Sequence, residues 1–133
     1  MTQLDFFQSL EAKIALSYEE GINLETAEKL SAEFLMGQLK VSEELRVKDL
    51  DSRMRKSGLK AIRAAVYMEA ATKGDKKPSD VMLQAIVDMD QIVTDQQNSF
   101  DEAEVERDNL ERLYNVFQQA HVYYRQISRG SMG

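Results

Sequence analysis

The chain has 133 residues, and its 23 Asp and Glu outweigh 17 Lys and Arg to give a formal net charge of −6 at pH 7. It contains one His and no Cys, which excludes disulfide bonds, thiolate zinc sites and cysteine nucleophiles and fits a reducing compartment. No run approaches the ~18 apolar residues of a membrane span, and the start shows no signal-peptide pattern. With only one Pro and six Gly, we expect a soluble, cytoplasmic, all-α protein in which residues 1–133 form a single helical domain.

A short helix is predicted over residues 1–20. The pattern Leu4, Phe7, Leu10 or Glu11, Ile14 and Tyr18 runs at steps of three and four, which is typical of an amphipathic helix. Gly21 is suited to end it, because glycine readily takes the left-handed conformation.

A much longer helix is predicted over residues 24–72, with Asn23 as its cap and Gly37 and Gly58 as its only interruptions. Its apolar face is not constant, because Val47, Leu50 and Met54 form a different stripe from the residues on either side. A buried face that rotates along a helix indicates different neighbours at the two ends. Both a hairpin partner and another subunit could supply them.

Residues 73–78 read as a turn, in which Gly74 and Asp75 break the helix and Pro78 starts the next one. A third helix is predicted over residues 79–128, which makes a long antiparallel hairpin with 24–72, and residues 129–133 are expected to be a disordered tail. This helix carries apolar residues at alternating steps of four and three, which predict a heptad seam against a partner and favour a homo-oligomer. The seam residues are Met82, Ile86, Met89, Val93, Phe100, Leu110, Tyr114, Phe117 and Tyr124.

Between Arg46 and Lys77 an otherwise acidic chain turns basic. Ten Lys and Arg face four Asp and Glu there, a formal charge of +6, which leaves −12 for the rest of the chain. Four of these residues fall at i, i+3, i+7 and i+10, a helical stripe about 15 Å long at ~1.5 Å per residue. They are Arg53, Lys56, Lys60 and Arg63.

Such a stripe suits a row of phosphates, and an acidic net charge does not exclude nucleic acid when the cations are segregated. The alternative is an ordinary solvated face, paired with the acidic remainder. Tyr67 lies near Arg63 and could stack on an unpaired base, although packing is the commoner use of tyrosines at helical spacing. The predicted nucleic-acid-binding residues are Arg53, Arg55, Lys56, Lys60, Arg63, Tyr67, Lys73, Lys76 and Lys77.

No catalytic motif stands out. The single His121 sits on the seam without a Glu-x-x-His pair, so we expect a core or interface residue. The acidic residues from Asp101 to Glu111 scatter around their helix, which favours a solvated face or a docking surface over an acid/base or metal site. We expect no enzyme, no metal and no cofactor.

The segment RKSGLKAIRAAVYMEAATKGDKK, residues 55–77, resembles the UvsY-type recombination mediators of tailed phages. The likeness lies in a Lys- and Arg-rich helix with a Leu-Lys-Ala core at residues 59–61, a nearby tyrosine and Gly-Asp turn, and a long closing helix with heptads. It covers residues 45–127. The arginine that would follow the core directly is Ile62 here, with Arg63 one place later.

The resemblance implies a non-enzymatic mediator of recombination and DNA repair that forms a ring-like homo-oligomer and binds single-stranded DNA through the basic segment. It also implies two protein partners, a recombinase and the single-strand-binding protein that the recombinase replaces, in the host cytoplasm if the chain is phage-encoded. Lys60 matches the family's motif by position and Arg63 approximately.

Two other kinds of function fit the same residues. One is a phage structural or assembly protein, such as a small terminase subunit or a scaffold, whose basic stripe docks on acidic surfaces. The other is a helical inhibitor or adaptor that binds a host protein through the seam of the third helix.

Overall fold

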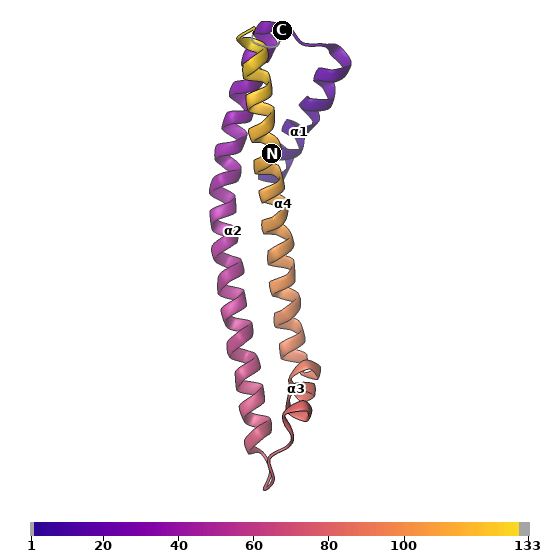
Figure 1. Cartoon of the computed structure of the whole chain (residues 1–133), viewed down its shortest axis with the longest axis vertical. Coiled ribbons are helices and arrows are strands. Elements are labelled where there is room, and N and C mark those ends of the chain that lie inside the picture. The colour runs from indigo at the N-terminus through magenta and orange to yellow at the C-terminus, as the bar shows by residue number, and fades with distance from the viewer. Residues whose placement is uncertain (1, 131–133) are drawn as a thin grey trace. The chain divides into compact units, whose positions relative to one another are not determined.

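The computed structural model describes residues 2–130, and those residues form four helices and no strand. The helices are α1 (Gln3–Glu20), α2 (Leu24–Thr72), α3 (Asp80–Met89) and α4 (Gln91–Ser128). The predicted all-α fold with a long packed helical pair is confirmed, the pair being α2 and α4 (Figure 1). Of the predicted tail, residues 131–133 lie outside the described residues.

Local signals explain where the helices begin and end. The hydroxyl of Thr2 accepts a hydrogen bond from the amide of Asp5, whose carboxylate accepts from the amide of Thr2, a capping box at the start of α1. Gly21 ends this helix with φ 77°, a value that L-residues rarely adopt. The side chain of Asn23 then accepts from the amide of Thr26 at 2.7 Å and caps α2.

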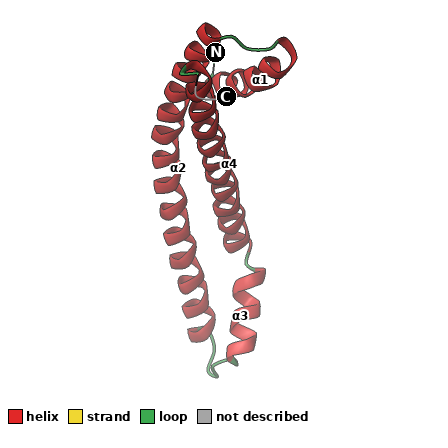
Figure 2. Cartoon of the chain, turned by 45° about the horizontal axis from the view of Figure 1, so that its top comes forward, coloured by secondary structure: helices red, strands yellow, loops and turns green. Residues whose placement is uncertain are grey.

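The predicted single helix over 79–128 is wrong at one residue. Asp90 has φ −67° and ψ 129°, so the chain leaves the helix between α3 and α4 (Figure 2). The Asp90 amide donates to the carbonyl of Val87 at 3.2 Å, while its carboxylate accepts from the amide of Val93 at 3.1 Å. One aspartate therefore closes α3 and caps α4, because its short acceptor competes with the helical hydrogen bonds.

Contacts divide the chain into two compact units. The terminal unit comprises residues 1–46 and 108–133, and the central unit comprises residues 47–107. In each unit a part of α2 lies antiparallel to a part of α4. Ser31 meets His121 in the terminal unit, and Arg55 meets Ser99 in the central unit.

Aromatic side chains fill the core of the terminal unit. The ring of Phe34 lies 5.7 Å from that of Phe117 and stacks on that of Tyr124 at 5.6 Å, while Phe7 of α1 lies 6.1 Å from Phe117. The Tyr124 hydroxyl is 2.6 Å from the hydroxyl of Ser17, so its polar end is satisfied. α1 thus completes a three-helix core with α2 and α4.

The central unit has a smaller core, made of Leu59, Val87, Val93 and Phe100, with partly buried residues of α2 around it. In α3 the buried residues are Leu83 and Val87, whereas the predicted seam residues Met82, Ile86 and Met89 are 59%, 41% and 85% exposed. The prediction of these seam residues requires one unbroken helix over residues 79–128. The extended residue Asp90 turns α3 about its axis, so that positions one residue later face α2.

Within α4 the heptad prediction describes burial well. The predicted seam residues Val93, Phe100, Phe117 and Tyr124 are buried, and Leu110 and Tyr114 are partly buried. Leu113, beside the seam, is buried too, because α1 widens the core of the terminal unit.

Candidate nucleic-acid interface

The candidate interface lies on the last part of α2 and the loop that follows. Lys56 and Lys60 are one helical turn apart and exposed, and within residues 2–130 neither lies within ion-pairing distance of a carboxylate. Side chains spaced by four residues on a helix are neighbours on its surface. These two ammonium groups are therefore adjacent charges available to an outside anion.

Arg53 lies on the same side of α2 and its side chain is 76% exposed. It pairs with Asp49, one turn earlier, at 3.0 Å. Exposed pairs of this kind contribute only ~0.3–0.5 kcal/mol and weaken further with salt. A phosphate can therefore compete for the Arg53 guanidinium.

Arg55 has a role inside the central unit. Its Nε atom lies 3.0 Å from a carboxylate oxygen of Asp51, and its Nη1 atom donates to the Ser99 hydroxyl at 2.8 Å and the Ser99 carbonyl at 3.1 Å. These bonds join α2 to α4. The sequence could not reveal them, because Ser99 is 44 positions away in the chain.

Arg63 is likewise engaged, since its Nη2 atom lies 2.8 Å from the carboxylate of Asp88 on α3. The predicted row of four cations is therefore reduced to three on the outer surface, with Arg63 holding α3 against α2. The rotation of α3 at Asp90 decides which α3 residues face Arg63, so sequence periodicity alone did not indicate the pair.

Tyr67 is turned toward the protein. Its hydroxyl donates to the carboxylate of Asp80 at 2.9 Å, and its ring packs against the core of the central unit. The hydrogen bond to Asp80, followed by burial and by the negative charge of Asp80, raises the pKa of Tyr67. This ring contributes to packing, so the stacking role predicted for it has no support in the geometry.

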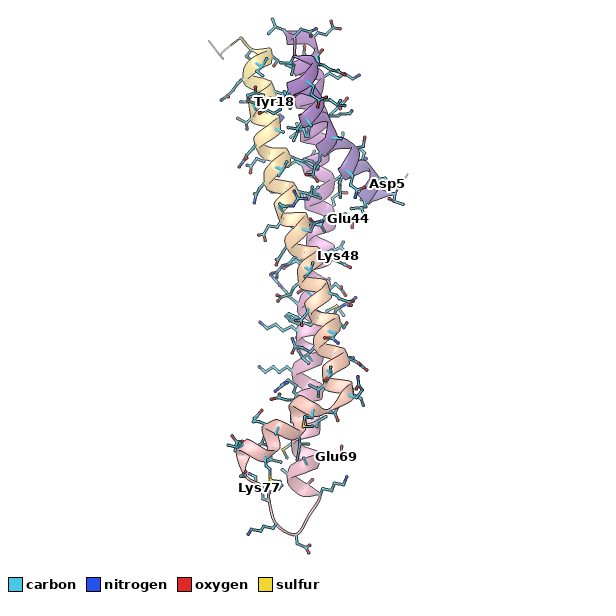
Figure 3. The ribbon with its side chains drawn as sticks, turned by 90° about the vertical axis from the view of Figure 1, so that its right-hand side faces the viewer. Asp5, Tyr18, Glu44, Lys48, Glu69 and Lys77 are labelled. Carbon is cyan, nitrogen blue, oxygen red and sulfur yellow. The ribbon has the colours of Figure 1, made fainter. Side chains whose placement is uncertain are left out.

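The loop after α2 adds three more cations. Lys73, Lys76 and Lys77 are exposed, and within the described part of the chain none has an ion pair (Figure 3 labels Lys77). A short loop with three lysines extends the positive surface of the central unit beyond the helix.

Within the described residues, the ion pairs between α2 and α4 do not include Lys56 or Lys60. Lys48 pairs with Glu106 at 2.8 Å, and Arg107 lies 3.8 Å from Asp49. Asp101 and Glu102, together with the paired Glu106, line a shallow hollow around the exposed Val105. The exposed Lys56 and Lys60 of α2 and the acidic hollow on α4 are therefore not paired with each other in the described structure.

The one histidine has a structural contact. The Nδ1 atom of His121 lies 2.9 Å from the carbonyl oxygen of Ser31, which can only accept, so Nδ1 carries the proton. The Ser31 hydroxyl in turn donates to the carbonyl of His121 at 3.3 Å. These bonds join α2 to α4 in the terminal unit.

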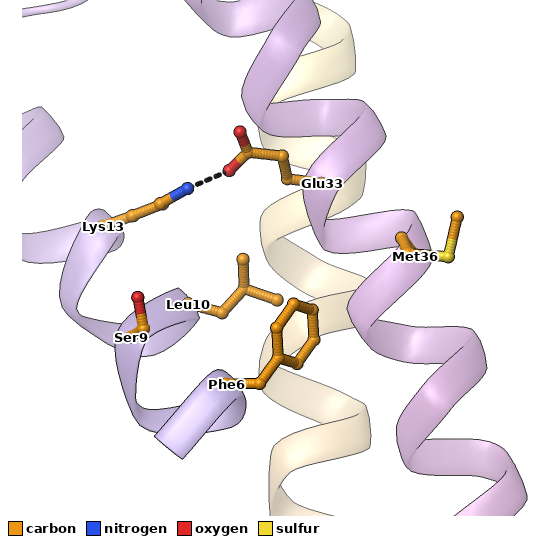
Figure 4. Close-up of a pocket in the computed structure, with 6 residues that line it drawn as sticks. All are labelled: Phe6, Ser9, Leu10, Lys13, Glu33 and Met36. Atoms are coloured by element: carbon orange, nitrogen blue, oxygen red, sulfur yellow. Dashed lines mark hydrogen bonds and ion pairs between the residues drawn. The ribbon is translucent and has the colours of Figure 1, made fainter. Parts of the chain in front are cut away.

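A cavity of about 280 Å³ lies between α1 and α2, with an ion pair of Lys13 and Glu33 at its edge (Figure 4). Phe6, Leu10 and Met36 make most of its wall apolar, and no nucleophile and base meet in it. Elsewhere in residues 2–130, no three His, Cys, Asp or Glu side chains gather as a metal site would need. None of the described helices has the length and apolar character that crossing a membrane requires.

Comparison with known proteins gives no relative: no family model, curated protein or solved structure matches the chain. The likeness to the UvsY-type mediators therefore remains a hypothesis based on the residues of the basic segment.

Proposed function

We propose that this chain is a non-enzymatic recombination mediator that binds single-stranded DNA through the exposed cations of its basic segment. The observation that carries this is charge segregation: Lys56, Lys60 and the lysines of the loop are exposed and without an ion pair in the described structure. Cations left without carboxylate neighbours release the counterions of a polynucleotide on binding, which favours association.

The mode of binding follows from the residue types. Lysine ammonium groups are point charges that hold phosphates without reading bases. With the ring of Tyr67 packed against the core, stacking supplies little of the affinity. We therefore expect binding that depends strongly on salt and weakly on sequence, and that gains strength when several subunits present the surface together.

Preference for a single strand, a ring-like assembly, and the loading of a recombinase in place of single-strand-binding protein rest on the resemblance of residues 55–77 to the mediator family. A straight helix with a flanking basic loop can follow a flexible backbone. It lacks the compact helix-turn-helix arrangement that reads a major groove.

The test is a fluorescence-anisotropy titration of a labelled single-stranded oligonucleotide and its duplex at several salt concentrations. Lys60→Gln should weaken binding to the single strand and lower the slope of log K against log salt by about 0.7. Lys29→Gln is the matched control, because Lys29 is an exposed lysine of α2 in the terminal unit. If Lys60→Gln and the unchanged protein bound the single strand with equal affinity, the result would show that α2 is not part of the DNA-binding surface.

A second candidate is an assembly protein whose lysines dock on the acidic surface of another copy. The hollow around Val105 favours it, because acidic side chains surround an exposed apolar one there. The double variant Lys56→Glu/Lys60→Glu distinguishes the two functions. It should abolish DNA binding and leave the molecular mass unchanged for a mediator, and lower the mass in light scattering for an assembly protein.

A further inference from the structure

The outer side of α2 in the central unit is apolar and uncovered. Val47, Leu50, Met54 and Met68 are 58%, 60%, 66% and 59% exposed. The core residues Leu59, Ile62 and Val66 point to the other side of the helix. Large apolar side chains that line up on an exposed face usually mark a contact surface.

These side chains follow a heptad repeat that the intrachain core does not use. With Val47 at the first core position, a, the a positions hold Val47, Met54, Ala61 and Met68, and the second core positions, d, hold Leu50, Ser57 and Ala64. All seven are exposed. Lys40 and Glu43 occupy the preceding a and d positions, so the apolar repeat begins at Val47.

We infer that this outer face of α2, residues 47–68, is the seam of a parallel, in-register contact with α2 of a second copy of the chain. The seam covers three heptads, ~33 Å of helix at 1.5 Å per residue. Small residues at three of its seven core positions let the two helices approach closely. They also bury less area than leucines would, so we expect the two copies to bind weakly and to associate only at high protein concentration.

Charge decides the direction of pairing. The g positions beside the seam hold Arg46, Arg53, Lys60 and Tyr67, whereas the e positions on the other side hold Asp51, Gly58 and Ala65. In an antiparallel pair g faces g, which would set the basic rows against each other. In a parallel pair g faces the e position of the next heptad, so that Arg46 meets Asp51 of the second copy.

The same charge pattern favours a second copy of this chain as the partner that binds the outer face of α2. A face with a basic edge and an edge that is acidic or uncharged is complementary to itself under a two-fold axis along the helices. This contact goes beyond the proposed function, because it forms without nucleic acid. It leaves Lys56 and the loop lysines outside the seam.

The chain contains no cysteine, so disulfide trapping can report the direction directly. The variants Val47→Cys and Met68→Cys should each form a disulfide-linked dimer under mild oxidation, because equivalent a positions meet in a parallel pair. Val105→Cys, at an exposed position of α4, is the control for random collision and should form no disulfide-linked dimer. In an antiparallel pair Val47 would instead lie near Ala64 of the other copy. Linkage only in a mixture of Val47→Cys with Ala64→Cys would overturn the parallel arrangement.

Light scattering over a range of concentrations tests the seam itself. The mass of the unchanged protein should rise with concentration from 15.2 kDa to at least twice that value. The double variant Leu50→Glu/Met54→Glu should lose this rise and keep an unchanged helical circular dichroism. Val105→Glu is the matched control and should still associate. A protein that is monomeric at every concentration, or that associates equally well with the two glutamates, would overturn the inference. Neither outcome depends on DNA binding.

Discussion

Two glycines within α2 have opposite surroundings. A Cβ atom added at Gly37 would meet the side chain of Leu10 and lie 3.2 Å from Cδ2 of Phe117, whereas one at Gly58 would meet nothing within 4 Å. Leu10 and Phe117 are both buried, so they have little room to yield. Gly37 thus permits the close approach of α1 to α2.

Gly37→Ala should therefore lower the free energy of unfolding by about 1–2 kcal/mol, because overpacking outweighs the gain in helix propensity. Gly58→Ala should raise it by about 0.5–1 kcal/mol, since only the propensity changes. Urea unfolding followed by circular dichroism measures both. Stabilisation by Gly37→Ala would mean that α1 is not held as closely as the structure shows.

The hydrogen bond between Tyr67 and Asp80 predicts a titration. The bond stabilises the neutral phenol, so the pKa of Tyr67 lies above its usual value. Its contribution to stability is present below the pKa of an unfolded tyrosine, and is lost as the pH rises through the raised, folded pKa. The ring carbons of Tyr67, followed by NMR, should titrate later than those of a free tyrosine. Asp80→Asn should lower the pKa of Tyr67, and an unchanged value would show that Asp80 is not its cause.

Among the candidate site residues, the lysines and Arg53 are exposed as their helical and turn positions suggest, whereas Arg55 and Arg63 contact other helices. The sequence pattern predicts that Lys56 and Lys60 lie on the surface of a helix and that three more lysines lie in a turn. All five are exposed at these places in the structure. Arg55 and Arg63 bind Ser99 and Asp88, partners that are near only after folding. A guanidinium has five donors and satisfies such distant partners readily, which a pattern of charges along the chain cannot indicate.

At the scale of the helices, Asp90 is the residue that sets the arrangement of the central unit. Asp90→Ala removes the carboxylate that accepts from the Val93 amide and should lower the free energy of unfolding by about 1 kcal/mol, as the loss of an N-cap does. Glu102→Ala, an exposed residue within α4, is the control and should change it by less than about 0.5 kcal/mol. Equal effects in thermal or urea unfolding would show that Asp90 does not act as a cap.

The sequence pattern predicts some helix boundaries and not others. The observed α2, Leu24–Thr72, has the bounds that its flanking Asn23 and Gly74 indicate. The apolar steps of four and three continue across Asp90, so the sequence pattern does not indicate the break there. Val81, Leu83 and Val87 make α3 apolar on several sides, so more than one face could serve as the buried one, and only packing against Leu59 and Arg63 selects it.

At the scale of the whole molecule, the two units differ in the size of their cores. The terminal unit buries Phe7, Phe34, Phe117 and Tyr124 together, whereas the core of the central unit contains one buried aromatic residue, Phe100. Local opening is easier where fewer apolar contacts must be broken. The two units should therefore open with different free energies.

Hydrogen exchange can test this within a single helix. Amides of α4 in the terminal unit, residues 110–124, should exchange more slowly than those of the same helix in the central unit, residues 93–107. Mass spectrometry of peptides from α4 measures both under identical conditions. Uniform protection along α4 would indicate that the two units unfold as one.

The methionines of the described chain all lie on the surface. Met36, Met54, Met68, Met82 and Met89 are each more than half exposed, and no methionine belongs to either core. A mild oxidant would convert their thioethers to sulfoxides, which are polar, while leaving the buried residues unaltered. Because Met54 and Met68 belong to the outer face of α2, oxidation should weaken the proposed pairing of copies without unfolding the chain, and a sulfoxide reductase should reverse the effect. In a chain without cysteine, the proposed contact between copies would thus be sensitive to oxidation through its methionines alone.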